Sequence, residues 1–215
     1  NNSLKVTVTT ADASLGSTQN AWVTQAIQGF NTADLGWGTA NAKRVTLSFW
    51  VRSSLTGTFG GVLKNLNTDR NYPFSYTISA ADTWEQKFIT IAGDTSGTWA
   101  GATNDGSINV WLNIGSGSSY LGTANTWATA DYRGVTGSVA VTGTNGATLY
   151  ITGVQLEVGT AATSFDYRPY GMELQLCYRY FQLYSAAAGA AGTSTRIWCM
   201  FNLTTPMRTG PTGSI

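Results

Sequence analysis

Histidine is absent from this sequence of 215 residues, and its absence removes several kinds of catalytic site. Without histidine the chain has no Ser-His-Asp triad, no Cys-His pair and no metal site with an imidazole ligand. Enzymatic chemistry by side chains is then limited to paired carboxylates, lysine and tyrosine.

Charged residues are scarce as well. They make up 11% of the sequence, against about 25% in typical globular proteins. With 12 Lys and Arg residues and 11 Asp and Glu residues, the formal net charge is +1. We therefore expect no nucleic-acid partner and no attraction to an anionic membrane. A surface made mainly of Ser, Thr, Asn, Gln and Gly is typical of extracellular and virion proteins, and it suits neutral partners such as glycans.

Cysteine and long apolar runs are also rare. The two cysteines, Cys177 and Cys199, lie in different segments and do not make a disulfide framework. We expect free, buried thiols in a protein assembled in a reducing cytoplasm. No apolar run approaches the roughly 20 residues of a transmembrane helix, so we expect no membrane insertion. Because the first residue is Asn1 and not Met, we expect a fragment of a longer protein.

Most of the sequence alternates between apolar and polar residues with a period of two, which predicts β-strands. Gly, Asn, Asp and Ser interrupt the alternation, as expected of turns. The expected strands include the segments 4–11, 44–54, 72–79, 84–93, 107–117, 137–143 and 147–159. About eight such strands predict an all-β fold, an antiparallel jelly-roll β-sandwich.

The alternation also assigns side chains to the two faces of each strand. In two strands the residues expected to face the core are Val45, Leu47, Phe49 and Val51, and Ile108, Val110, Leu112 and Ile114. Their outward neighbours are Thr46, Ser48, Trp50 and Arg52, and Trp111 and Asn113. Gly153 predicts a bulge that shifts the phase of the last strand. The inward residues expected near it are Val139, Val141, Leu149, Ile151, Val154 and Leu156.

The pattern changes after Tyr170, where GMELQLCYRYFQLYS contains good helix formers. One apolar stripe of this helix contains Leu174, Cys177 and Phe181, with Tyr180 beside it. The small-residue segment 186–194 is expected to be a loop, and alternation from 195 onward predicts an incomplete C-terminal β segment. We expect three parts: a sandwich over 1–168, a hinge and short helix over 169–184, and the start of a β domain over 185–215.

The segment GVQLEVGTAATSFDYRPYGMELQLCYRYFQ (153–182) resembles one that recurs in bacteriophage tail-fibre and other virion appendage proteins. In that family it joins a jelly roll, similar to galactose-binding and carbohydrate-binding modules, to a C-terminal β domain. Segments 34–59, 83–99, 109–127 and 206–212 also look like parts of that architecture, so the resemblance covers roughly 20–215. It implies the architecture more specifically than the ligand.

Outward-facing aromatic residues are the candidate glycan site. Trp and Tyr rings stack on the apolar faces of sugars, while Asn, Gln and Arg bond the hydroxyl groups. If strands 44–54 and 107–117 are adjacent, one polar-aromatic platform is formed by Trp50, Arg52, Trp111 and Asn113. The alternative is that each of them packs beneath a helix or loop that covers the outer face.

Paired carboxylates would be the remaining route to glycoside cleavage. The available residues are Asp69, Asp82, Glu85, Asp94, Asp105 and Asp131, and none lies in a recognisable catalytic motif. Asp94 and Asp105 have the surroundings of turn residues. No Asp-x-Asp loop indicates a Ca²⁺ site. We assign no metal site and expect neither a catalytic residue nor a cofactor.

Two further groups have structural interpretations. Trp37, Trp99 and Trp127 lie in Gly- and Thr-rich turns, where a Trp more often plugs the end of a sandwich than stacks on a ligand. Asp166 and Arg168 are expected to form a surface ion pair of small energetic value.

The helix offers two alternatives. Its stripe of Leu174, Cys177, Tyr180 and Phe181 either docks on the chain's own sandwich or forms a homotrimer interface, as the resemblance implies. We expect a structural and adhesive protein of a phage virion that binds host-surface glycans and other virion proteins. The alternatives are a structural spacer or decoration protein that binds no sugar, and, less favoured, a polysaccharide depolymerase.

Overall fold

The computed structural model describes residues 2–66, 70–183, 188–193, 196–200 and 203–210. The chain divides into two compact units, Asn1–Phe165 and Asp166–Ile215, which we describe separately.

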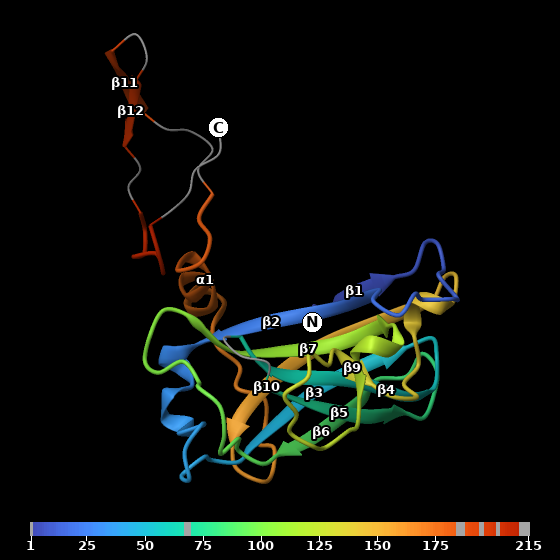
Figure 1. The fold of residues 1–215 in the computed structure, drawn as a ribbon. Helices are drawn as coiled ribbons and strands as arrows, with labels where there is room; N and C mark the ends of the chain where they lie inside the picture. The colour runs from blue at the N-terminus through green and yellow to red at the C-terminus, as the bar shows by residue number, and fades with distance from the viewer. Residues whose placement is uncertain (1, 67–69, 184–187, 194–195, 201–202, 211–215) are drawn as a thin grey trace. The chain divides into compact units, whose positions relative to one another are not determined.

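The first unit contains two antiparallel sheets of four strands each (Figure 1). Sheet A has the order β1 (Leu4–Thr7), β10 (Thr148–Val158), β3 (Val45–Ser53) and β6 (Glu85–Ile91). Sheet B has the order β2 (Asn20–Gln28), β7 (Gly106–Ser116), β4 (Gly57–Asn65) and β5 (Asn71–Ile78). A short parallel pair is formed by β8 (Leu121–Gly122) and β9 (Gly134–Val135). Four 3₁₀ turns lie between them: η1 Gly29–Asn31, η2 Ala33–Leu35, η3 Ser118–Tyr120 and η4 Val141–Gly143.

The order of the strands identifies the topology. When only the eight strands of the two sheets are counted, β10 is the eighth strand along the chain. The order is then 1-8-3-6 in sheet A and 2-7-4-5 in sheet B. The chain thus crosses between the sheets at every connection except the β4–β5 hairpin, which is the arrangement of a jelly roll. The predicted antiparallel jelly-roll β-sandwich is confirmed.

The core lies between the sheets, and the predicted inward residues of β3 and β7 are in it. Val45, Leu47, Phe49 and Val51 are at most 1% exposed. Those of β7 are nearly as deeply buried: Ile108, Val110, Leu112 and Ile114. Both strands contribute to one continuous apolar cluster. Alternation therefore assigned both inner faces correctly, because one side of each sheet is removed from water.

The predicted bulge in the last strand is present. The register of β10 against β3 shifts between Thr152 and Gln155, and Gly153 has φ +58°. The prediction that Val154 faces inward is wrong, since this side chain is 42% exposed. Val154 lies within the bulge, outside the regular ladder, and the inward phase resumes at Leu156, which is paired with Leu47.

Other strand predictions need correction. Segment 137–143 contains η4 instead of a strand, although Val141 is fully buried and Val139 packs against the core. Thr46 and Ser48 do lie on the outer face, but they are buried. Segment 159–164 crosses that part of sheet A: Thr46 Oγ1 donates to the carbonyl of Gly159 at 2.9 Å.

In the second unit, α1 (Tyr170–Tyr178) is shorter than the predicted helix. A hairpin follows, with β11 (Ala188–Thr193) antiparallel to β12 (Arg196–Met200). The prediction of a loop over 186–194 is wrong for 188–193, because backbone pairing needs no large side chain. The predicted C-terminal strand is confirmed over β12. Gln182 links the later segment to the helix region, since its side chain donates to Tyr178 and Thr205 carbonyls at 3.1 and 2.8 Å.

The expectation of buried thiols is wrong for Cys177, which is exposed. All of α1 is described and none of its residues is buried, so a cysteine on this helix contacts solvent. The side chain of Cys199 lies outside the described residues, as does Phe201. Within the described ranges, no helix has the length and apolar composition of a bilayer span.

Candidate functional site

The four predicted glycan-binding residues belong to two different sheets. Trp50 and Arg52 lie on β3 in sheet A, while Trp111 and Asn113 lie on β7 in sheet B. The adjacency on which a single platform depended is therefore absent. In a jelly roll these two strands are separated by the core, so their outer faces point in opposite directions.

On the outer face of sheet B, aromatic rings stack on one another and on the side chains of Lys64 and Arg133. Trp22 and Trp111 lie parallel, with 4.5 Å between ring centroids and 1° between planes. Lys64 Nζ is 5.4 Å from the Trp111 ring, and the Arg133 guanidinium carbon is 3.9 Å from the Tyr120 ring. These are distances at which cations and rings attract each other.

Asn113 fixes a loop over this face. It is 2% exposed, and its Nδ2 donates to Ser116 Oγ at 2.5 Å and to the Arg133 carbonyl at 2.9 Å. Farther along, the backbone of Asn71 exchanges hydrogen bonds with Ala128 at 2.9 and 3.0 Å. Since Asn113 is buried and its side-chain N–H groups bond within the protein, it has a structural role.

The Asp131 carboxylate joins the loop to the sheet by ion pairs with Lys64 and Arg133, the latter at 2.7 Å. Burial raises the pKa of Asp131, but hydrogen bonds from Arg133 and Lys64 outweigh burial, and the net pKa lies below the ordinary value. These ion pairs hold the loop over the outer face of sheet B. Among the described residues, three buried polar atoms on this face still lack a hydrogen-bond partner: Trp111 Nε1, Asn109 Oδ1 and Arg133 Nε.

The outer face of sheet A is more open. Strand register aligns Lys5 of β1, Tyr150 of β10 and Arg52 of β3 in one row. Trp84 immediately precedes β6 and continues this row, because Glu85 is paired with Val51. Lys5 Nζ and the Arg52 guanidinium carbon lie 5.4 and 5.2 Å from the Tyr150 ring.

A second row runs parallel to the first. It aligns Thr152 of β10, Trp50 of β3 and Gln86 of β6. Trp50 is 39% exposed and Trp84 is 38% exposed, so both rings are reachable from solvent. We call the surface formed by the two rows the sheet A platform: Lys5, Trp50, Arg52, Trp84, Gln86, Tyr150 and Thr152.

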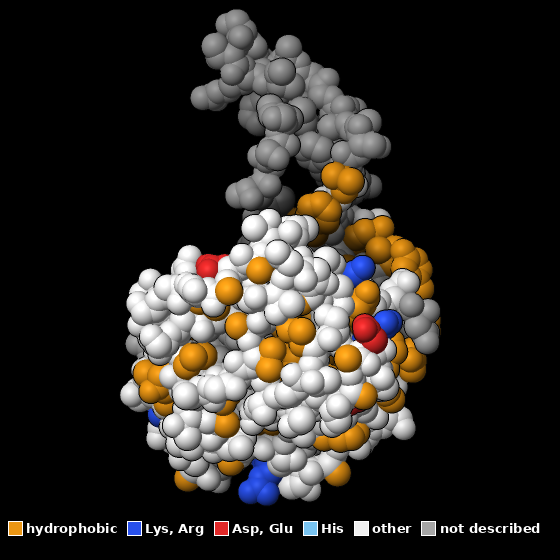
Figure 2. Space-filling model, turned by 90° about the vertical axis from the view of Figure 1, so that its right-hand side faces the viewer, with side chains coloured by type: hydrophobic (Ala, Val, Ile, Leu, Met, Phe, Trp, Pro, Cys, Tyr) orange, Lys and Arg blue, Asp and Glu red, His pale blue; other side chains and the backbone are white. Residues whose placement is uncertain are grey.

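The platform is amphipathic and nearly neutral. Arg52 Nη2 pairs with Asp82 Oδ1 at 3.3 Å, which leaves Lys5 as the remaining cation of the rows. Exposed rings can stack on the apolar faces of sugars, and the amide and hydroxyl groups can bond sugar hydroxyls. Charged groups are also few on the face in Figure 2.

The sequence predicted Trp50 and Arg52 of the platform and missed its other five residues: Lys5, Trp84, Gln86, Tyr150 and Thr152. Tyr150 has the outward phase of the 147–159 alternation, and Trp84 and Gln86 share the phase of Phe88 in WEQKF. These signals identify the outward face of each strand. They do not tell which strands are neighbours.

All three of these tryptophans pack on the core, as predicted: Trp37 belongs to the buried cluster, and Trp99 and Trp127 are partly buried against it. Trp37, Trp99 and Trp127 meet edge to face, with centroid separations of 4.7, 5.5 and 5.7 Å. Each indole N–H donates to a backbone carbonyl, at 2.7, 3.1 and 2.8 Å respectively. We call these three residues the indole cluster.

Four of the candidate carboxylates form ion pairs within the protein: Asp82, Glu85, Asp94 and Asp131. Asp94 is 1% exposed and accepts bonds from Arg70 Nε and Nη2 at 2.7 and 2.5 Å. It also accepts from the Ser96 N–H at 3.1 Å, which fits its predicted role in a turn. Lys87 and the N–H groups of Ala80 and Ser79 lower the pKa of Glu85 to about 2. Asp69 lies outside the described residues. Among the described residues, no group of three or more Cys, Asp and Glu side chains is placed to hold a metal ion.

The second unit places the predicted interface residues differently. Leu174 and Cys177 lie on α1, but Tyr180 and Phe181 follow its end at Tyr178. The N–H groups of Tyr180 and Phe181 still donate to the Cys177 carbonyl, at 2.9 and 3.1 Å, and their side chains are 52% and 67% exposed. Whether the four residues form an interface between chains stays a prediction. The predicted pair is present, with Arg168 Nε 3.4 Å from Asp166 Oδ2.

No family model matches this chain, and no curated protein matches it. The chain is similar to a solved structure described as "CBM4 structure and function". The similarity covers 73% of this chain and 84% of that chain, at 14% identity and a TM-score of 0.38. At such identity a similarity concerns the fold alone, and no ligand follows from it.

Proposed function

We propose that the first unit binds carbohydrate through the sheet A platform. The observation that supports this most is the placement of two solvent-exposed tryptophans on one sheet face: Trp50 on β3 and Trp84 directly before the neighbouring strand β6. Large exposed rings cost solvation free energy, and they mark interaction sites when they gather.

The ligand expected from this chemistry is a glycan of low charge. Indole rings cover the C–H faces of sugars without needing charge, and Gln86 and Thr152 supply polar groups between the rings. Strands hold the rings on a rigid surface, so little conformational entropy is lost on binding. The proposed activity is binding without chemistry.

The alternative of a spacer that binds no sugar predicts no ligand at all. A glycan array probed with the purified protein separates the two. Binding to at least one glycan class supports the proposal, whereas an empty array favours the spacer. Release of new reducing ends from a bound polysaccharide would instead identify a depolymerase.

We further propose that the second unit associates with copies of itself as a homotrimer. A nine-residue helix without buried residues and a two-stranded hairpin are each marginal alone in water. Exposed apolar side chains are numerous around the helix: Tyr167, Tyr170, Met172, Leu176, Tyr180, Phe181 and Leu183. Burying them between chains would provide the missing core.

Sedimentation measures this association. The intact chain should sediment as a trimer, and Phe181→Glu should shift it toward the monomer, because a charge at an interface loses its water. Phe181 is 67% exposed and lies outside the first unit, so the first unit should keep its thermal unfolding transition in this variant. A wild-type monomer at micromolar concentration contradicts the proposal.

The resemblance of segment 153–182 to phage appendage proteins supports placing the chain in a virion, where it would contact other virion proteins. Three or more copies per particle would multiply weak glycan contacts into avidity. Immunogold labelling of intact particles with an antibody against the first unit tests this location. Labelled appendages are the expected result, and unlabelled particles contradict it.

A further inference from the structure

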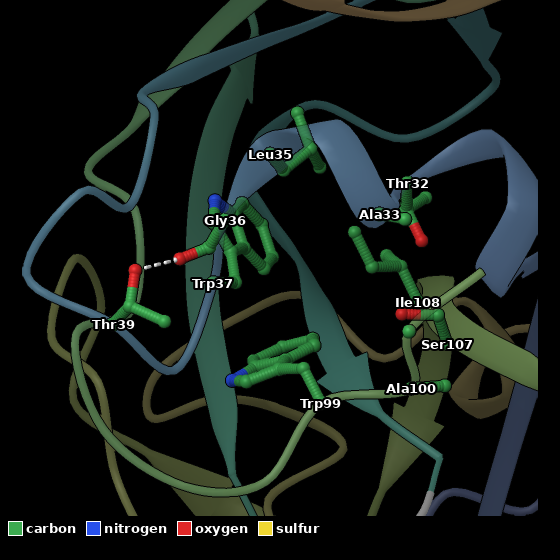
Figure 3. A pocket seen from close by; sticks show the side chains of 11 residues that line it. Thr32, Ala33, Leu35, Gly36, Trp37, Thr39, Trp99, Ala100, Ser107 and Ile108 are labelled. Carbon is green, nitrogen blue, oxygen red and sulfur yellow. Dashed lines mark hydrogen bonds between the residues drawn. The ribbon is translucent and has the colours of Figure 1, made fainter.

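A small pocket lies beside the indole cluster, at an end of the sandwich away from the two rows of the sheet A platform. Its volume is about 180 Å³, and residues from η2, the loop after it, the β6–β7 loop and the start of β7 line it (Figure 3). Ala33, Thr39 and Gly101 on its rim are exposed, so it communicates with solvent.

The pocket has one aromatic side and one hydroxylic side. In Figure 3 the rings of Trp37 and Trp99 lie opposite Thr32 and Ser107. The two rings are held edge to face at 4.7 Å, and their N–H groups are used by backbone carbonyls. The rings therefore offer fixed apolar surface and no competing donor.

Ser107 supplies the observation that points to a polar ligand. The residue is only 1% exposed and lines the pocket. A ligand hydroxyl that enters the pocket can form a hydrogen bond with Ser107 Oγ, whereas an apolar ligand cannot.

Size and charge narrow the ligand class. An apolar cavity of about 150 Å³ holds a benzene ring, so this pocket accommodates a six-membered ring of similar or slightly larger size. None of its lining residues, all of which the structure describes, carries a charge. We propose that the pocket binds one neutral pyranose, such as the terminal residue of a glycan, with a C–H face against Trp99 and a hydroxyl bonded to Ser107.

This inference shares with the proposed function only the premise that the ligand is carbohydrate. It places a terminal-residue site apart from the platform. Methyl glycosides of glucose, galactose, mannose and N-acetylglucosamine are suitable probes, with toluene as the apolar comparison. The eight Trp side chains provide indole N–H signals in a ¹H–¹⁵N spectrum, and Trp99→Phe and Trp50→Phe assign the two that matter.

One methyl glycoside should shift the Trp99 indole signal in a saturable way and leave the Trp50 signal unchanged. Ala100→Leu, which fills the pocket, should abolish the shift, and Ser107→Ala should weaken binding about fivefold. Ser118→Ala, an exposed serine in η3, is the matched control and should bind as wild type.

Three results would overturn the pocket site. They are no Trp99 shift with any glycoside, a shift with toluene only, or wild-type affinity in both Ala100→Leu and Ser107→Ala. Failure of the pocket site can be told apart from failure of the proposed glycan binding by the sheet A platform. Oligosaccharide binding that is lost in Trp50→Ala but retained in Ala100→Leu supports the platform alone, and the reverse pattern supports the pocket alone.

Discussion

Gly153 and Trp50 are in close contact across β10 and β3: a Cβ built on Gly153 would lie 3.3 Å from Trp50 Cδ1. Gly153 also has φ +58°, a conformation that L side chains rarely adopt. The bulge that the glycine permits thus sets the position of an exposed platform ring.

Gly153→Ala should destabilise the first unit by about 1–2 kcal/mol through left-handed strain and should also displace the Trp50 ring. Gly146→Ala is the matched control, since Gly146 has φ +73° and nothing within 4 Å of its Cβ position. Thermal unfolding should show similar losses for both variants, with weakened glycan binding only for Gly153→Ala. Equal glycan binding by both variants would contradict the idea that the bulge at Gly153 positions Trp50 for binding.

Asp94→Asn should be strongly destabilising, because it leaves Arg70 without its charged partner beneath the loops. The side chains of Asp94 and Arg70 are 2% and 15% exposed, and breaking such a buried pair costs about 3–5 kcal/mol. Asp34→Asn removes an exposed pair with Lys43 at 3.8 Å and should cost at most about 1 kcal/mol. Chemical denaturation measures both, and equal losses would contradict the assigned role of Asp94.

Glu85 should make stability depend on acid pH. Its folded pKa of about 2 lies below the ordinary 4.5, because Lys87 and two backbone N–H groups stabilise the carboxylate. This contribution is complete above about pH 4.5 and is lost as the pH falls through 2. The melting temperature of Glu85→Gln should therefore lie below that of wild type at pH 7, and the difference should shrink toward pH 2. A constant difference would contradict this ionisation.

Trp111→Ala should reduce the unfolding free energy much more than Trp50→Ala. Trp111 stacks on Trp22 and beneath Lys64, so its removal should cost about 2 kcal/mol or more of unfolding free energy. Trp50 is 39% exposed, and its removal should change stability by less than about 1 kcal/mol. Chemical denaturation of both variants tests the division, and a larger loss for Trp50→Ala would reverse the assignment.

The sequence predicted the fold class and the inward and outward faces of the strands. It did not predict which strands are neighbours within a sheet. Period-two alternation marked the inward residues of β3 and β7 because each sheet has one wet and one dry side. Which strands pair depends on the crossing path of the chain. For that reason Trp50 and Trp111 were placed on one platform, although the core separates them.

The sequence did not predict β2 and β4 of sheet B, because their residues are not typical of strands. β2 carries two Gln and an Asn, and β4 carries three glycines. In β4, a Cβ at Gly61 would lie 2.4 Å from the Phe74 ring, and one at Gly60 would lie 3.2 Å from Val135. These glycines are required by packing between segments distant in sequence, so their strand conformation has a tertiary cause.

In the second unit, too, the local sequence does not predict where the helix ends. Helix-forming residues continue to Gln182, but α1 ends at Tyr178. The chain then turns, and Gln182 bonds both the end of the helix and Thr205. The bond from Gln182 to Thr205 spans 23 residues, and local helix propensity does not contain such a contact.

The most direct test of the platform is a calorimetric titration of the strongest array glycan into wild type, Trp50→Ala, Trp84→Ala and Trp111→Phe. The account predicts that Trp50→Ala and Trp84→Ala each weaken binding at least about tenfold, or 1.4 kcal/mol, while Trp111→Phe binds as wild type. Undiminished binding by both sheet A variants, with loss in Trp111→Phe, would contradict it and place the site on sheet B.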